Sequence, residues 1–75
     1  MVILKNITKT ANEISADYFP EGKEPMGFMK LRLSDNKVIE HIGNKYSMAP
    51  MHVRYELQRL AKVDNPPTEK NVIWY

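Results

Sequence analysis

Two histidines are the side chains in this sequence best suited to acid–base or metal chemistry. A carboxylate stands close to each of them, because Glu40 precedes His41 and Glu56 follows His52 by about one helical turn. A catalytic zinc site needs about three protein ligands in one place, and the HExxH spacing that would supply them is absent. Two exposed histidines explain the same pattern, so we expect no metal site.

Candidate nucleophiles are present only as residue types. No serine lies in a G-x-S-x-G elbow, and turns or helix caps account for Ser34 and Ser47. The glycines at positions 22, 27 and 43 lack the spacing of a phosphate-binding loop. The chain also has no cysteine for a disulfide or a thiolate site. We therefore expect a protein that is not an enzyme and that uses no cofactor and no small-molecule substrate.

A basic–aromatic strand segment is the first candidate binding surface. Alternation places Phe28, Lys30 and Arg32 on one face of a strand. Sheet faces that stack bases and neutralise phosphates have this pattern, but the solvated face of an ordinary strand has it too. Stacked aromatics on adjacent strands are not evident in the sequence. Single-stranded nucleic-acid binding is therefore the alternative function, and a net charge of +2 gives it little support.

A helix with two apolar sides is the second candidate. At about 100° per residue, one side forms a core-facing stripe of Val53, Leu57, Leu60 and Ala61. Met48, Met51 and Tyr55 fall on the opposite side, where a polar rim would consist of Arg54, Gln58, Arg59 and Lys62. A small domain needs only one apolar helix face, so the second one predicts a partner.

Two interpretations of Met48, Met51 and Tyr55 remain open. They belong to the core if the preceding loop covers them, with the Tyr55 ring lying flat. They form an interface if they are exposed, since methionine and tyrosine suit adaptable contacts. Trp74 and Tyr75 are a further candidate anchor, although a final strand that closes the core explains Trp74.

The length of the chain limits what it can hold. Residues 1–75 form a single domain, and a domain of this size buries only about 60–65% of the surface that its unfolded chain exposes. No segment approaches the roughly 20 apolar residues that span a bilayer, and the N-terminal residues are too few for a signal-peptide core. We therefore expect a cytoplasmic protein without membrane contact.

Hydrophobic periodicity predicts the order of the elements. A period of two runs through residues 2–8, 13–19, 27–33 and 38–42, a period of about 3.6 governs residues 49–63, and strand formers return at 71–75. Ser47 suits the N-cap of the helix, and Pro50 suits its first turn. The expected fold is α+β: an antiparallel meander of about four strands, one helix on one face and a C-terminal strand, in the order ββββαβ.

The first strand has apolar residues at both even-numbered and odd-numbered positions. Val2 and Leu4 fall on one side, and Ile3 and Ile7 fall on the other. Apolar residues on both faces favour an interior strand. We therefore expect the last strand to pair antiparallel beside the first, so that both are central.

The third and fourth strands should form a hairpin. Asp35 and Asn36 tolerate a positive φ and suit a two-residue turn. Such a turn pairs Leu33 with Val38, and it pairs Leu31 with Glu40, which is a poor match. The register of this hairpin is therefore the weakest part of the predicted sheet.

The favoured function is a small protein-interaction or accessory module without chemistry of its own. A thin core favours association, because an interface adds buried area. The simplest partner is a second copy that contacts Met48, Met51 and Tyr55, and another protein is the alternative partner. The edge strand that ends at Ile42 offers a second route, by strand addition.

Overall fold

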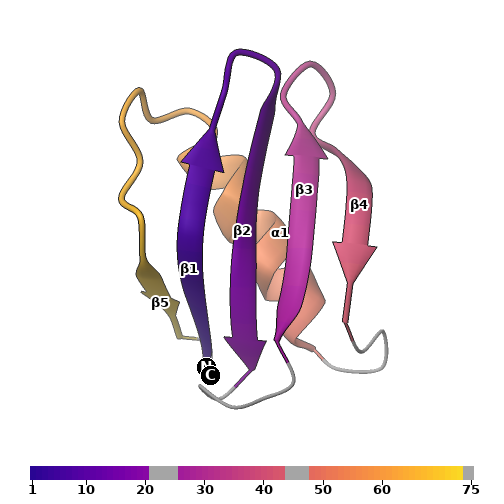
Figure 1. The fold of residues 1–75 in the computed structure, drawn as a ribbon, viewed down its shortest axis with the longest axis vertical. Helices are drawn as coiled ribbons and strands as arrows, with labels where there is room; N and C mark the ends of the chain where they lie inside the picture. Colours follow the sequence, from indigo (N-terminus) through magenta and orange to yellow (C-terminus); the bar gives the residue numbers. More distant parts are fainter. Residues whose placement is uncertain (21–25, 44–47, 74–75) are drawn as a thin grey trace.

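The structure, a computed structural model, describes residues 1–20, 26–43 and 48–73. Five strands and one helix follow one another in the predicted order (Figure 1). The elements are β1 (Val2–Lys9), β2 (Glu13–Pro20), β3 (Gly27–Arg32), β4 (Lys37–Ile42), α1 (Ala49–Leu60) and β5 (Lys70–Val72). The α+β fold with an antiparallel meander is confirmed.

The strands form one antiparallel sheet in the order β4-β3-β2-β1-β5. α1 lies on one face of this sheet and packs on β1, β2, β3 and β5, and the other face has no helix on it (Figure 1). The last strand pairs antiparallel beside β1, as predicted, but β5 is an edge strand and not a central one. Of the predicted strand at 71–75, Trp74 and Tyr75 lie outside the described residues.

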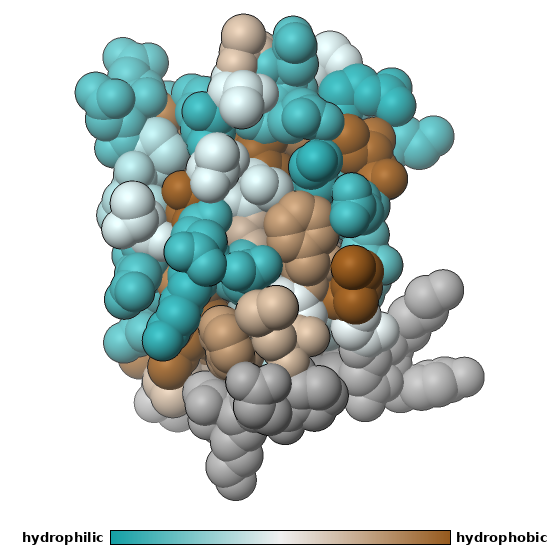
Figure 2. Space-filling model, in the orientation of Figure 1, coloured by the Kyte–Doolittle hydropathy of each residue, from teal (hydrophilic) through white to brown (hydrophobic). Residues whose placement is uncertain are grey.

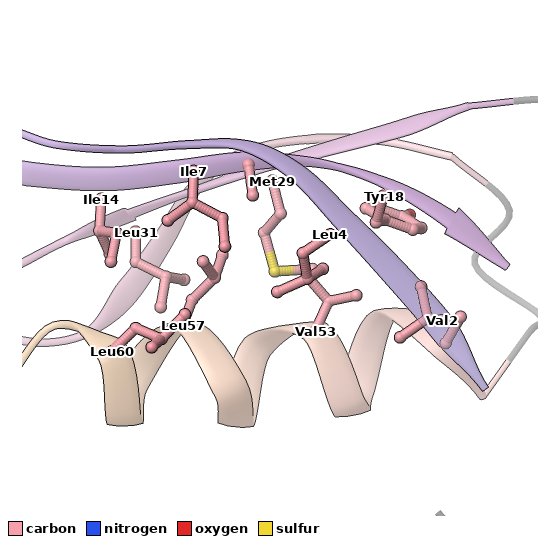
Figure 3. Close-up of a cluster of buried hydrophobic side chains, with 12 residues drawn as sticks. Val2, Leu4, Ile7, Ile14, Tyr18, Met29, Leu31, Val53, Leu57 and Leu60 are labelled. Atoms are coloured by element: carbon pink, nitrogen blue, oxygen red, sulfur yellow. The ribbon is translucent and has the colours of Figure 1, made fainter. Parts of the chain in front are cut away.

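The core lies between the sheet and α1, where alternate residues of the strands point toward the helix (Figure 3). In β2, β3 and α1, the periodicity places the apolar residues on the predicted side. The buried set is Val2, Leu4, Ile7, Ile14, Ala16, Tyr18, Met29, Leu31, Ala49, Val53, Leu57 and Leu60. Ala61, the last residue of the predicted stripe, is partly buried against this core.

A β-bulge in β1 overturns the predicted placement of Ile7 on the same face as Ile3. The inference that this strand is interior is confirmed, because β1 lies between β2 and β5. Lys5 pairs with Asp17 and Thr8 pairs with Ser15, so β1 has one residue more than β2 over this stretch. Asn6 adopts a φ of 54° in the bulge, a conformation that asparagine tolerates better than most residues. The extra residue reverses the alternation, so Ile7 is buried on the same face as Val2 and Leu4.

The register of the β3–β4 hairpin also differs from the prediction. Leu31 pairs with Val38, and Lys30 pairs with Glu40. The register shifts between these pairs, so Ile39 is an extra residue of β4. The turn spans residues 33–36 and not only Asp35 and Asn36, so an apolar residue, Val38, faces Leu31. The bulge then places a carboxylate, Glu40, opposite Lys30.

The helix is shorter than the predicted 49–63, since it ends at Leu60 with Ala61 as its C-cap. Its N-cap is Met48, which makes no side-chain capping hydrogen bond, and Pro50 lies in the first turn as predicted. The predicted cap, Ser47, lies outside the described residues. In the part of the chain that the structure describes, no helix has the length and apolar character needed to cross a membrane.

Candidate functional site

Three apolar residues on the outer side of α1, Met48, Met51 and Tyr55, are exposed and form what we call the helix patch. Their exposed fractions are 59%, 41% and 58%, whereas Val53 and Leu57 on the inner side are fully buried. The two sides of the helix therefore differ as the sequence predicted. The interpretation that the three residues belong to the core is wrong.

A hollow of about 250 Å³ adjoins the helix patch, between α1 and the edge strand β4. It exists because α1 packs mainly on the central strands and leaves the inner face of β4 partly uncovered. Its lining combines apolar residues with three polar ones: Met29, Val38, His41, Pro50, Met51, Arg54 and Tyr55. No local pattern in the sequence indicates this hollow, because its lining residues come from three elements.

Tyr18 fixes the position of His41 at the side of the hollow. The Tyr18 hydroxyl forms a hydrogen bond of 2.6 Å with His41 Nε2, and it lies 3.3 Å from the Ile42 carbonyl oxygen, which can accept its proton when His41 Nε2–H is the donor. The two rings are stacked with their centroids 5.9 Å apart. Burial raises the pKa of Tyr18, so the hydroxyl stays protonated over the ordinary pH range.

Two glycines make room for the Tyr18 ring. A Cβ atom at Gly27 or at Gly43 would overlap the ring or the hydroxyl of Tyr18, and Gly43 has a φ of 144° that side chains rarely adopt. The end of β4 is therefore shaped around one buried aromatic residue. This arrangement holds the His41 imidazole in place, where it can offer Nδ1 to a bound group.

Arg54 gives the hollow a positive charge. The structure shows no ion pair between Arg54 and any described residue. By contrast, Glu56 on the same helix is already engaged, because its carboxylate lies 2.6 Å from the Arg59 guanidinium and 2.7 Å from the Lys70 ammonium. The hollow thus combines an apolar lining with a cation that no described carboxylate neutralises.

The predicted nucleic-acid face, Phe28, Lys30 and Arg32, lies on the helix-free face of the sheet, but its two cations are paired. The Lys30 ammonium lies 4.0 Å from the Glu13 carboxylate and 3.9 Å from that of Glu40. The Arg32 guanidinium lies 3.3 Å from the Asp35 carboxylate. A phosphate would have to compete with these carboxylates, which weakens the case for nucleic acid.

An aromatic residue that the sequence did not single out joins this face. Phe19 on β2 points outward, since its neighbour Tyr18 is buried, and it is diagonal to Phe28 on β3. We call Ile3, Phe19, Phe28 and Ile42 the sheet patch, because the register places all four on the outer face. Figure 2 shows apolar side chains gathered over part of this face, among polar ones.

Lysine ammonium groups lie over both aromatic rings of the sheet patch. The distance from Nζ to the ring centroid is 5.4 Å for Lys5 over Phe19 and 5.9 Å for Lys30 over Phe28. Two aromatic residues on adjacent strands, Phe19 and Phe28, are therefore present, although the sequence singled out only Phe28. These cation–π contacts occupy the faces on which a base would stack.

The remaining candidates do not converge on a site. A depression of about 750 Å³ lies at the β1–β2 and β3–β4 turns, but its charged residues, Glu13 and Arg32, are paired with Lys30 and Asp35. His41 is on β4 and His52 is on α1. Among residues 1–20, 26–43 and 48–73, no group of three histidine, cysteine or carboxylate residues could hold a metal ion.

No family model matches the chain, and comparisons with curated proteins and with solved structures find no significant match. The helix patch, the sheet patch and the charges beside them are therefore the features of the molecule that bear on its function.

Proposed function

We propose that the protein is a small cytoplasmic protein-interaction module without chemistry of its own, and that the helix patch is its interface. The observation that supports this most is the exposure of Met48, Met51 and Tyr55 beside an apolar hollow. Methionine and tyrosine form adaptable contacts at protein interfaces. A second copy is the simplest partner, because twofold homodimers are the commonest soluble oligomers.

Sedimentation velocity over a range of protein concentrations tests this proposal. We expect a reversible dimer that Tyr55→Asp dissociates, since the substitution places a charge in the interface, while the unfolding free energy stays almost unchanged. Val63→Asp is the matched control, because Val63 is also exposed and apolar but lies beyond the end of α1. Equal effects of the two substitutions, or a monomer at all concentrations, would contradict self-association through the helix patch.

Single-stranded nucleic-acid binding by the sheet is the second candidate, and the observation that favours it is the presence of Phe19 and Phe28 on adjacent strands. If this face binds oligonucleotides, Phe28→Ala should weaken binding by roughly 1–3 kcal/mol through lost stacking. The affinity should also fall steeply with salt. A fluorescence titration of mixed-sequence oligonucleotides at low salt decides the matter, and absence of binding at high micromolar protein would remove this candidate.

A further inference from the structure

The charges around the hollow discriminate between partners for the helix patch, and the inference drawn from them rests on the proposed function. Arg54 and His41 line the hollow, and none of its described lining residues is a carboxylate. The nearest acidic residue of α1, Glu56, is engaged by Arg59 and Lys70. The hollow is therefore an apolar site with a positive charge that no carboxylate of residues 1–20, 26–43 and 48–73 compensates.

Two copies of this surface can associate through their apolar residues, but their charges make the association weak. In a twofold dimer the same patch faces itself, so Arg54 of each copy approaches a surface that is also basic. Like charges across an interface weaken it, whereas a partner with the opposite charge binds more tightly and more selectively. An acidic partner would supply the carboxylate that the described part of the chain does not provide.

The edge strand β4 constrains how a partner can bind. Its outer edge is free of a neighbouring strand, but the bulge at Ile39 interrupts the regular backbone pattern. Bulges of this kind oppose long strand-to-strand pairing. Recognition therefore depends on side chains that enter the hollow, rather than on extension of the sheet by a long strand.

We propose that the hollow between β4 and α1 binds a short acidic–apolar peptide segment of another protein. An apolar side chain of the segment packs against Met29, Val38 and Met51. A neighbouring carboxylate pairs with the Arg54 guanidinium and accepts a charge-assisted hydrogen bond from it. The His41 ring, held by Tyr18, provides a polar contact at the side of the site.

Three synthetic peptides with blocked ends test this proposal. The first repeats leucine–serine–glutamate, the second has lysine in place of glutamate, and the third has serine in place of leucine. Binding is followed by NMR of ¹³C-labelled methionine methyl groups in the full chain. We expect only the first peptide to shift the signals of Met29 and Met51, while Met26, which does not line the hollow, stays unchanged.

Arg54→Gln should weaken binding of the acidic peptide by about tenfold, the value of one hydrogen bond to a charged group. Lys62→Gln is the matched control, because it removes the same charge from a residue that does not line the hollow. The acidic peptide should also shift the sedimentation of the protein toward monomer, since both partners use Met51 and Tyr55.

The outcomes separate the two proposals. A dimer that Tyr55→Asp dissociates, without binding of the acidic peptide, would overturn the peptide site and leave the protein-interaction function intact. Equal binding of the glutamate and lysine peptides, or equal effects of Arg54→Gln and Lys62→Gln, would overturn the role of charge. Binding of the acidic peptide by a strictly monomeric protein would support the peptide site and reject self-association.

Discussion

The helix patch is exposed, whereas the sheet patch is half-buried except at Ile42. The two patches also differ in whether the charges beside them are paired. On the sheet, Lys30 lies between two carboxylates, and lysine ammonium groups lie over Phe19 and Phe28. Beside the helix patch, Arg54 has no described carboxylate partner. Exposed apolar area alone therefore does not identify a binding surface. The helix side, where Arg54 has no carboxylate partner among the described residues, is the better candidate, because a partner can still supply one.

We expect the largest difference in unfolding free energy between substitutions on the two sides of α1. Leu57→Ala should lower the unfolding free energy by about 2–5 kcal/mol, because it leaves a cavity in the core. Tyr55→Ala should change it by less than about 0.5 kcal/mol, because the side chain is 58% exposed. Urea denaturation followed by circular dichroism measures both values. A large loss for Tyr55→Ala would mean that the helix patch stabilises the fold, and the contrast with the core side would disappear.

The second prediction concerns the sheet, which we expect to contribute to the stability of the fold and not to peptide binding. Asn6→Val should destabilise the protein by about 1–2 kcal/mol, because a β-branched residue tolerates the left-handed conformation poorly. Asn6→Gly is the control, since glycine accepts this conformation and loses only the exposed hydrogen bond to Asp17. Thermal unfolding distinguishes the two variants. Comparable losses for both would point to the hydrogen bond as the main contribution.

The smallest expected effect comes from Glu56, which joins α1 to β5 through Lys70. Burial raises the pKa of this carboxyl, but the hydrogen bonds and charges of Arg59 and Lys70 outweigh burial, so its net pKa lies below the ordinary value. A lowered pKa in the folded state stabilises the protein above the unfolded-state pKa. This stabilisation is lost as the pH falls through the folded-state pKa.

Glu56→Gln should therefore cost about 1 kcal/mol or less at neutral pH, as expected for a partly exposed ion pair. The difference from the unsubstituted protein should vanish in acid, where the carboxyl is protonated in both states. Urea denaturation at several pH values measures this convergence. A difference that persists in acid would show that packing of the side chain matters more than its charge.

The fold could be predicted in outline because its signals are local. Strand alternation predicted that Ile14, Ala16 and Tyr18 share one face, and the helical period predicted the same of Val53 and Leu57. All five are buried in the structure. Local patterns also placed Met48, Met51 and Tyr55 on the outer side of α1. They could not reveal the bulge before Ile7, because one extra residue in β1 is visible only when β1 is aligned with β2.

The sequence by itself determined the order of the elements, most of the residues that face the core and the apolar outer side of the helix, since each follows from the period of a single segment. Tertiary structure decided the burial of Ile7, the position of Phe19 beside Phe28 and which cations have a carboxylate partner among the described residues. Lys30 is neutralised by carboxylates on β2 and β4, and the hollow brings His41 of β4 beside Arg54 of α1. Such contacts join residues that are distant in the chain, so they depend on strand register and on the placement of the helix, which no local pattern specifies.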